Sequence, residues 1–121
     1  MTKRALAKVI LDALPVEISN SLVLIMETQR IHPKVQRISE KPLQIELRGE
    51  NGMSLRSWGE YIKITITEET IGSRIQAEST PKVVTTLVDY GQNKKNLESL
   101  LKPLIMKYKI ISQLKLEQKI L

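Results

Sequence analysis

The first third of the chain changes from a mostly apolar run to apolar residues at helical spacing. Residues 5–14 predict a strand that ends at Pro15, because proline has no backbone N–H to donate. Apolar side chains then recur at helical spacing over 16–29, and proline suits the first turn of a helix. Pro33 predicts the end of this helix, because the residue before it, His32, avoids helical dihedral angles.

Alternating apolar and polar residues follow in four short segments, which predict strands with one polar face. The segments are Val35–Ser39, Leu43–Arg48, Ile62–Thr67 and Arg74–Ser79. None of them shows the pattern of a strand that is buried on both faces. An antiparallel meander is therefore expected.

The clearest helical pattern lies near the C-terminus. Apolar side chains from Leu97 to Tyr108 recur three or four residues apart, and Asn93 is predicted to be the N-cap of this helix. Pro103 lies inside the pattern and predicts a kink, because its ring removes one intrahelical hydrogen bond. Residues 110–121 remain rich in apolar side chains without a strict period, and they are expected to form a C-terminal extension or association segment.

The predicted order of elements is β-α-β-β-β-β-α, which is typical of a two-layer α+β domain with one antiparallel sheet. Both helices are expected on one face, because each strand has only one apolar side. With 121 residues, the chain is expected to form a single domain, residues 1–121. Aromatic residues make up only 3% of the chain, so the core must be aliphatic.

Composition narrows the classes of function. The chain has no Cys and a single His, His32, so the sequence offers no thiolate nucleophile and no His pair for zinc. No glycine-rich phosphate-binding motif occurs, and the adjacent acids Glu68 and Glu69 fall in a predicted turn. We therefore expect no enzyme activity, no metal and no cofactor. No apolar run reaches the length of a membrane-spanning helix, and a cytoplasmic location is expected.

Positive charge is concentrated at the C-terminal end. The formal charge is +6, and residues 94–121 hold seven Lys against two Glu. A basic segment favours nucleic acid or an anionic membrane surface as a partner. Nucleic acid is disfavoured because basic residues are not interleaved with aromatic ones along any strand. A membrane surface is disfavoured because the same pattern describes a helix packed on its own sheet.

The first stretch with candidate binding residues contains the only tryptophan, Trp58, between Arg56 and Glu60. We expect Trp58 to be buried and structural, with Arg56 and Glu60 paired nearby. The alternative is a recognition patch, because Trp and Arg are enriched at binding hot spots.

The second stretch places Asn93, Lys94 and Lys95 at the start of the last predicted helix. The N-terminus of a helix carries partial positive charge, so two lysines there oppose the helix dipole. Capping by Asn93 with both lysines in solvent is the expected arrangement. The alternative is an anion bound between the helix amides and the ammonium groups.

The two stretches also carry a resemblance. The segments SLRSWGE at 54–60 and DYGQNKKNLESLL at 89–101 resemble two motifs of a family of small uncharacterised bacterial proteins. In that family a hydrophobic-Asp-aromatic-Gly-x-Asn-x-x-Asn element leads the C-terminal helix. The resemblance covers about residues 7–108 and implies a compact α+β domain, like one repeat of the TATA-binding-protein fold or a trimmed helix-grip domain. It implies no activity, and Pro103 and residues 110–121 depart from the family pattern.

With no catalytic constellation in the sequence, the favoured function is a non-enzymatic binding or protein-interaction domain. A small apolar ligand between the sheet and the last helix is one candidate partner. The alternative is that the basic C-terminal segment binds nucleic acid or an anionic membrane surface. Because the apolar residues of 110–121 exceed what a solvated tail normally carries, self-association through this segment, most simply as a two-fold dimer, is also predicted.

Overall fold

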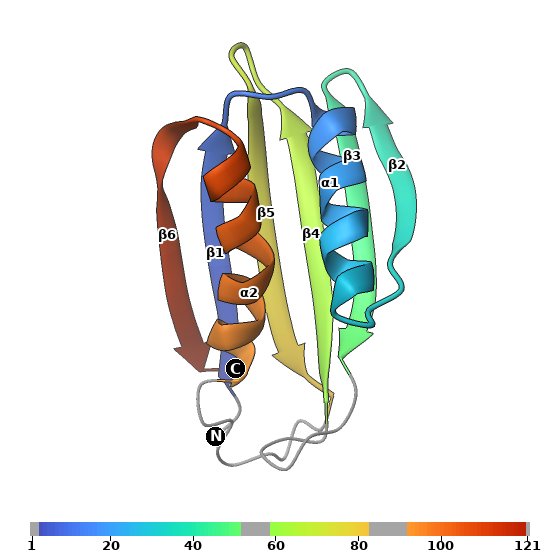
Figure 1. Ribbon diagram of the computed structural model, residues 1–121, viewed down its shortest axis with the longest axis vertical. Coiled ribbons are helices and arrows are strands. Elements are labelled where there is room, and N and C mark those ends of the chain that lie inside the picture. The colour runs from blue at the N-terminus through green and yellow to red at the C-terminus, as the bar shows by residue number, and fades with distance from the viewer. Residues whose placement is uncertain (1–2, 52–58, 83–91, 121) are drawn as a thin grey trace.

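The computed structural model describes residues 3–51, 59–82 and 92–120. These residues form the following eight elements (Figure 1): β1 (Lys3–Leu11), α1 (Pro15–Thr28), β2 (Lys34–Glu40), β3 (Leu43–Asn51), β4 (Glu60–Glu68), β5 (Ser73–Pro81), α2 (Gln92–Lys107) and β6 (Ile110–Ile120). The strands form one antiparallel sheet in the order β2-β3-β4-β5-β1-β6. Neither α1 nor α2 is long and apolar enough to cross a membrane.

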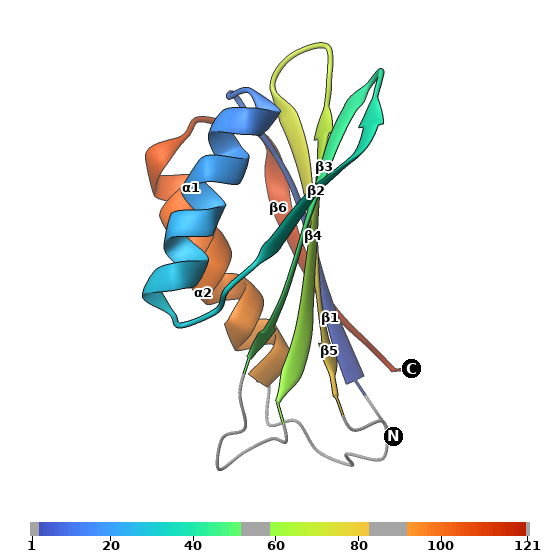
Figure 2. The ribbon, with the colours of Figure 1, turned by 90° about the vertical axis from the view of Figure 1, so that its right-hand side faces the viewer.

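Both helices pack on the same face of the sheet, as the view along its edge shows (Figure 2). The predicted two-layer α+β fold is therefore confirmed. The helices are also tied to each other by side chains. The hydroxyl groups of Ser21 on α1 and Tyr108 after α2 lie 2.7 Å apart, and Lys107 Nζ donates to Ser21 Oγ at 3.1 Å.

The alternation of apolar and polar residues along the strands explains why both helices pack on one face. In β4, Ile62, Ile64 and Ile66 are almost fully buried, whereas Tyr61 and Lys63 on either side of Ile62 are exposed on the opposite face. The facing side of α2 supplies four buried leucines: Leu97, Leu100, Leu101 and Leu104. Burying each such side chain contributes about 1.5–3 kcal/mol, so the aliphatic layer between sheet and helices dominates stability. The other face of the sheet, which we call the open face, is mostly polar and includes Leu6 of β1.

The sixth strand is the main element that the sequence analysis missed. Residues 110–120 form β6, which pairs with β1 and makes it an interior strand. The β1–β6 register shifts on both sides of Ile10, and such irregularities interrupt the period of two that identifies a strand. Self-association through 110–121 stays a prediction.

One boundary also differs from expectation. β1 ends at Leu11, whereas the apolar run continues to Leu14, which is exposed in the connection to α1. The last helix continues through Pro103 to Lys107, as its apolar pattern predicts, with the proline on its exposed side. The kink at Pro103 stays a prediction. An exposed proline in the last turns keeps its ring away from the packed face, so the leucine layer is uninterrupted.

The connection between α1 and β2 lies close against β3. The N–H groups of Arg30 and Ile31 donate to the carbonyl oxygens of Glu27 and Met26, at 3.0 and 2.9 Å, which is the Schellman arrangement of a helix end. Ile31 is buried beside Gly49 of β3, and a Cβ atom on Gly49 would lie 2.6 Å from Ile31 Cγ2. The missing side chain at position 49 therefore lets this connection lie on the sheet.

We predict that Gly49→Ala lowers the free energy of unfolding by about 1–3 kcal/mol, the usual cost of overpacking a core. Urea denaturation measures the loss. In an Ile31→Ala background, which removes Cγ2, the same substitution should cost less, because contacting residues are energetically coupled. An equal cost in both backgrounds would show that the contact with Ile31 is not the cause.

Candidate functional site

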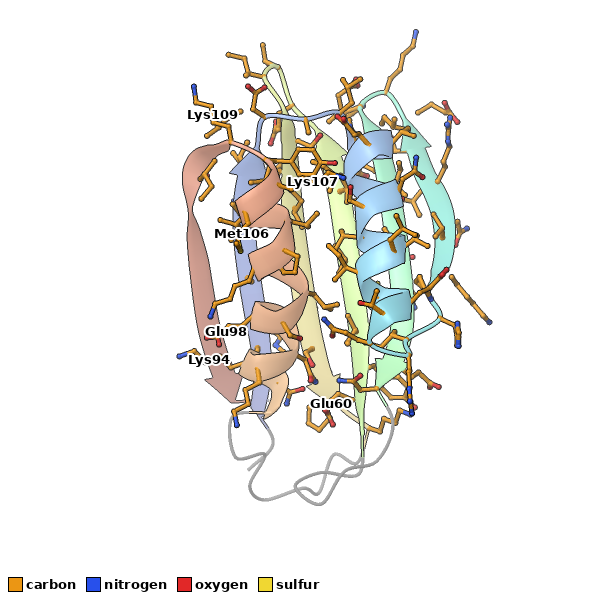
Figure 3. The ribbon with its side chains drawn as sticks, viewed as in Figure 1. Glu60, Lys94, Glu98, Met106, Lys107 and Lys109 are labelled. Atoms are coloured by element: carbon orange, nitrogen blue, oxygen red, sulfur yellow. The ribbon has the colours of Figure 1, made fainter. Side chains whose placement is uncertain are left out.

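The two candidate stretches meet at one end of the sheet. Glu60, the first residue of β4, is 2% exposed, and its Oε1 accepts a hydrogen bond of 2.8 Å from Asn96 Nδ2 on α2. Glu60 lies at the end of the sheet where α2 begins (Figure 3). The hydrogen bond thus joins the SLRSWGE and DYGQNKKN segments, which are far apart in the sequence.

Further hydrogen bonds extend this contact into a buried polar network of Asn51, Glu60, Ser79, Asn93 and Asn96. Asn51 Nδ2 donates to Asn96 Oδ1 at 2.7 Å, and Ser79 Oγ donates to Asn93 Oδ1 at 2.7 Å. Asn96 Nδ2 also lies 3.3 Å from Ser79 Oγ. Buried polar groups are costly without partners, so the network fixes the start of α2 against β3, β4 and β5.

The prediction that Asn93 is an N-cap is wrong. The helix begins one residue earlier, at Gln92, and Asn93 is fully buried with its amide oxygen hydrogen-bonded to Ser79 of β5. Its position in the first turn faces the sheet, where a polar side chain must find its partner inside the core. Lys94 and Lys95 are exposed, as expected.

Arg56 and Trp58 lie outside the described residues. The expectations that Trp58 is buried and that Arg56 pairs with Glu60 therefore stay predictions. Among the described members of the six candidates, Glu60 and Asn93 belong to the buried polar network.

A different feature opens on the open face of the sheet. A groove of about 820 Å³, which we call the open-face groove, runs over β3, β4 and β5 and reaches the α1–β2 connection. Its lining includes five basic side chains and one aromatic ring: Arg30, His32, Lys34, Arg48, Lys63 and Tyr61. A second hollow of about 380 Å³ adjoins it and shares Lys63 and Glu78.

Beneath the groove, Glu46 is held between two cations. Its carboxylate lies 3.0 Å from Arg48 Nε and 3.6 Å from Lys63 Nζ, and the Glu46 side chain is 9% exposed. The hydrogen bond from Arg48 holds the pKa of Glu46 below its ordinary value, although burial opposes that shift. The nearby charge of Lys63 acts in the same direction as Arg48.

The other carboxylates of the groove are paired as well. Glu78 lies 3.3 Å from Arg4, and Glu50 lies 3.7 Å from Lys82. Counting the lining residues and their ion-pair partners, six Lys and Arg side chains stand against three Glu, an excess of three positive charges with His32 neutral. The groove is therefore electropositive although its walls contain acids.

Three of the basic side chains come from the α1–β2 connection and the first residue of β2. Arg30, His32 and Lys34 are exposed, and none of them forms an ion pair with another residue of the described ranges. Arg30 has a φ of 61°, the left-handed conformation in which glycine or asparagine is usual at a helix end. An arginine at this position carries a conformational cost that its turn does not require.

Tyr61 lies within this basic lining and is 50% exposed. The sequence analysis found no aromatic residue interleaved with basic ones, yet Tyr61 and Lys63 are two positions apart on β4 and share the open face. The Tyr61-x-Lys63 spacing could have revealed that pair. Arg30, His32 and Lys34 could not have been added, because only the pairing of β2 with β3 brings them alongside β4.

The space between sheet and helices offers less to a ligand. Leu97, Leu100 and Leu104 of α2, which packs on β1 and β5, are fully buried there. Both hollows described above open on the opposite face, so the small apolar ligand expected behind the last helix stays a prediction without structural support.

Comparison with known proteins adds no assignment. No protein-family model matches the sequence, and no curated protein is significantly similar to it. The family resemblance therefore stays an expectation, and the functional argument rests on the geometry and charge of the described residues.

We predict that Asn96→Ala lowers the free energy of unfolding by about 1–3 kcal/mol, because it removes hydrogen-bond partners of buried groups. Lys95→Ala on the same helix is the control, and it should change the free energy by no more than about 0.5 kcal/mol, as exposed substitutions do. Urea denaturation compares the two variants. If the two substitutions changed the free energy of unfolding equally, the hydrogen bonds of the buried polar network would not contribute to stability.

We also predict an acid-dependent contribution from Glu46. Its pKa is lower in the folded than in the unfolded chain, so its stabilising effect is complete above the unfolded pKa and disappears as pH falls through the folded pKa. Glu46→Gln should therefore reduce the loss of unfolding free energy on acidification. The control is Glu40→Gln, whose side chain is 76% exposed and 3.9 Å from Arg37. Identical pH profiles for wild type and Glu46→Gln would contradict the prediction.

Proposed function

We propose that the protein is a non-enzymatic binding module that takes a polyanionic partner in the open-face groove. The observation that carries the proposal is the group of exposed basic residues Arg30, His32 and Lys34 beside a groove whose carboxylates already have cationic partners. Such clustered charge raises the local concentration of anions and accelerates their association. A cytoplasmic location remains part of this proposal.

The conformation of Arg30 supports the same reading. Non-glycine residues in the left-handed region are uncommon, and local strain is concentrated at functional sites. The Schellman turn at the end of α1 would be satisfied by glycine, which has no Cβ penalty. A guanidinium at this point adds charge to the rim of the groove, which glycine cannot do.

The main competing site is the basic C-terminal segment, residues 94–121. In the structure this segment is divided between α2, in the helix layer, and β6, in the sheet. Its lysines therefore do not form one continuous basic helix, which an anionic polymer or membrane would recognise. The open-face groove gathers its cations around one hollow and is the better-supported site.

We predict that Arg30→Gly separates stability from binding. Relief of the left-handed arginine should raise the free energy of unfolding by up to about 1 kcal/mol. The same variant should bind inorganic polyphosphate more weakly and elute from heparin at lower salt. Lys34→Gln should also weaken anion binding, with no comparable gain in stability.

The matched controls are Lys94→Gln and Lys102→Gln, which remove one exposed charge each from α2. If these variants lose as much polyphosphate affinity as Lys34→Gln, the binding is non-specific or belongs to the C-terminal segment, and the groove is not the site. A wild-type protein that binds neither heparin nor polyphosphate at low salt would refute the proposed function outright.

A further inference from the structure

An aromatic ring among the cations distinguishes the open-face groove from a purely electrostatic surface. Lys82 Nζ lies 5.7 Å from the centroid of the Tyr61 ring, and Glu50 holds that ammonium at 3.7 Å. The ring is thus backed by a cation–π contact while half of the side chain stays exposed. A fixed, exposed ring of this kind suits the stacking of a flat ligand group.

The two hollows together form an extended path across the strands. They share Lys63 and Glu78, and the second continues from β4 and β5 to Lys8 on β1. From β3 to β1 the path crosses three interstrand spacings, roughly 14 Å. Thr65 and Gln76 along it offer hydrogen-bonding groups. An open path of this length fits a polymer better than it fits a small molecule, which usually binds in an enclosed pocket.

We infer that the polyanion is a single-stranded nucleic acid that lies across the open face, an inference that rests on the proposed function. One base stacks on Tyr61, and backbone phosphates lie near Arg30, His32 and Lys34. Single-strand binders combine a basic groove with aromatic side chains on which bases stack. Polyphosphate and anionic lipid headgroups supply the charge but have no flat ring to place on Tyr61.

A double-stranded ligand fits less well. In a duplex the faces of the bases are stacked on each other, so Tyr61 could not reach them without disrupting the helix. Phosphate contacts alone would then hold the duplex. Tyr61 should therefore contribute to the affinity for a single strand but not to the affinity for a duplex of the same sequence.

The test measures the binding of labelled short oligonucleotides of mixed sequence, as single strands and as duplexes, by fluorescence anisotropy over a range of salt. Tyr61→Leu removes the ring, and Tyr61→Phe keeps it. Inorganic polyphosphate is measured in parallel as an anion without bases, and phosphatidylserine vesicles as an anionic surface. Urea midpoints verify that each variant is folded.

We expect Tyr61→Leu to bind the single strand roughly five-fold or more weakly, whereas Tyr61→Phe binds like wild type. Because neither change alters charge, the salt dependence of both variants and their polyphosphate affinity should stay the same. Lys34→Gln should instead weaken both ligands and lower the logarithmic salt slope for the single strand by about 0.7. Lys94→Gln should leave both affinities near the wild-type values.

Several results would overturn the inference while the proposed function stands. One is an unchanged single-strand affinity in Tyr61→Leu. Another is an equal loss for polyphosphate, which would make Tyr61 a residue that shapes the groove. If a duplex bound as tightly as the single strand, phosphate contacts alone would account for the binding. Vesicle binding that depends on Lys34, without oligonucleotide binding, would assign the groove to a membrane surface. Loss of all anion binding would instead refute the proposed function.

Discussion

The structure depends on a sheet that can bury only one of its faces. In β3 and β4 aliphatic side chains alternate with polar ones, as Ile62 and Ile64 do with Tyr61 and Lys63 on β4. Both helices must therefore cover the same face, and the leucines of α2 complete that layer. The second face is left mainly to polar and charged residues. On this face the main interactions between side chains are ion pairs such as that of Glu46 with Arg48. A partner that binds this face therefore contacts these charged groups.

The close approach of Ile31 to Gly49 connects this architecture with the proposed site. Because position 49 has no side chain, the chain leaving α1 lies directly on β3 and carries Arg30 and His32 to the rim of the open-face groove. Arg30 occupies a conformation that favours glycine, so local stability and positive charge are in conflict at this residue. Proteins commonly accept such costs at binding sites.

The buried polar network has a different role from the groove. Glu60 and Asn96 belong to the two segments that stand out in the sequence, and their hydrogen bond joins these segments at the start of α2. A satisfied network of buried polar groups specifies how elements dock, because any other docking would leave its members without partners. The unusual residues of these segments are thus explained, within the described part of the chain, by the docking of α2 on the sheet. The groove, in contrast, is built from residues that are individually ordinary.

The sequence by itself determined the fold class, both helices and the strands β1 to β5, because a period of two or 3.6 is a local property of the chain. It did not determine that residues 110–120 form a strand, since the irregular register beside Ile10 interrupts the period. Asparagine occurs both as an N-cap and as a buried hydrogen-bonding residue, so the role of Asn93 could not be assigned from its position in the sequence alone. Charge counted along the chain pointed to the C-terminal lysines. Only the tertiary structure placed Arg30, Lys34, Arg48 and Lys63 around Tyr61, because strand pairing brings together residues that are distant in the sequence.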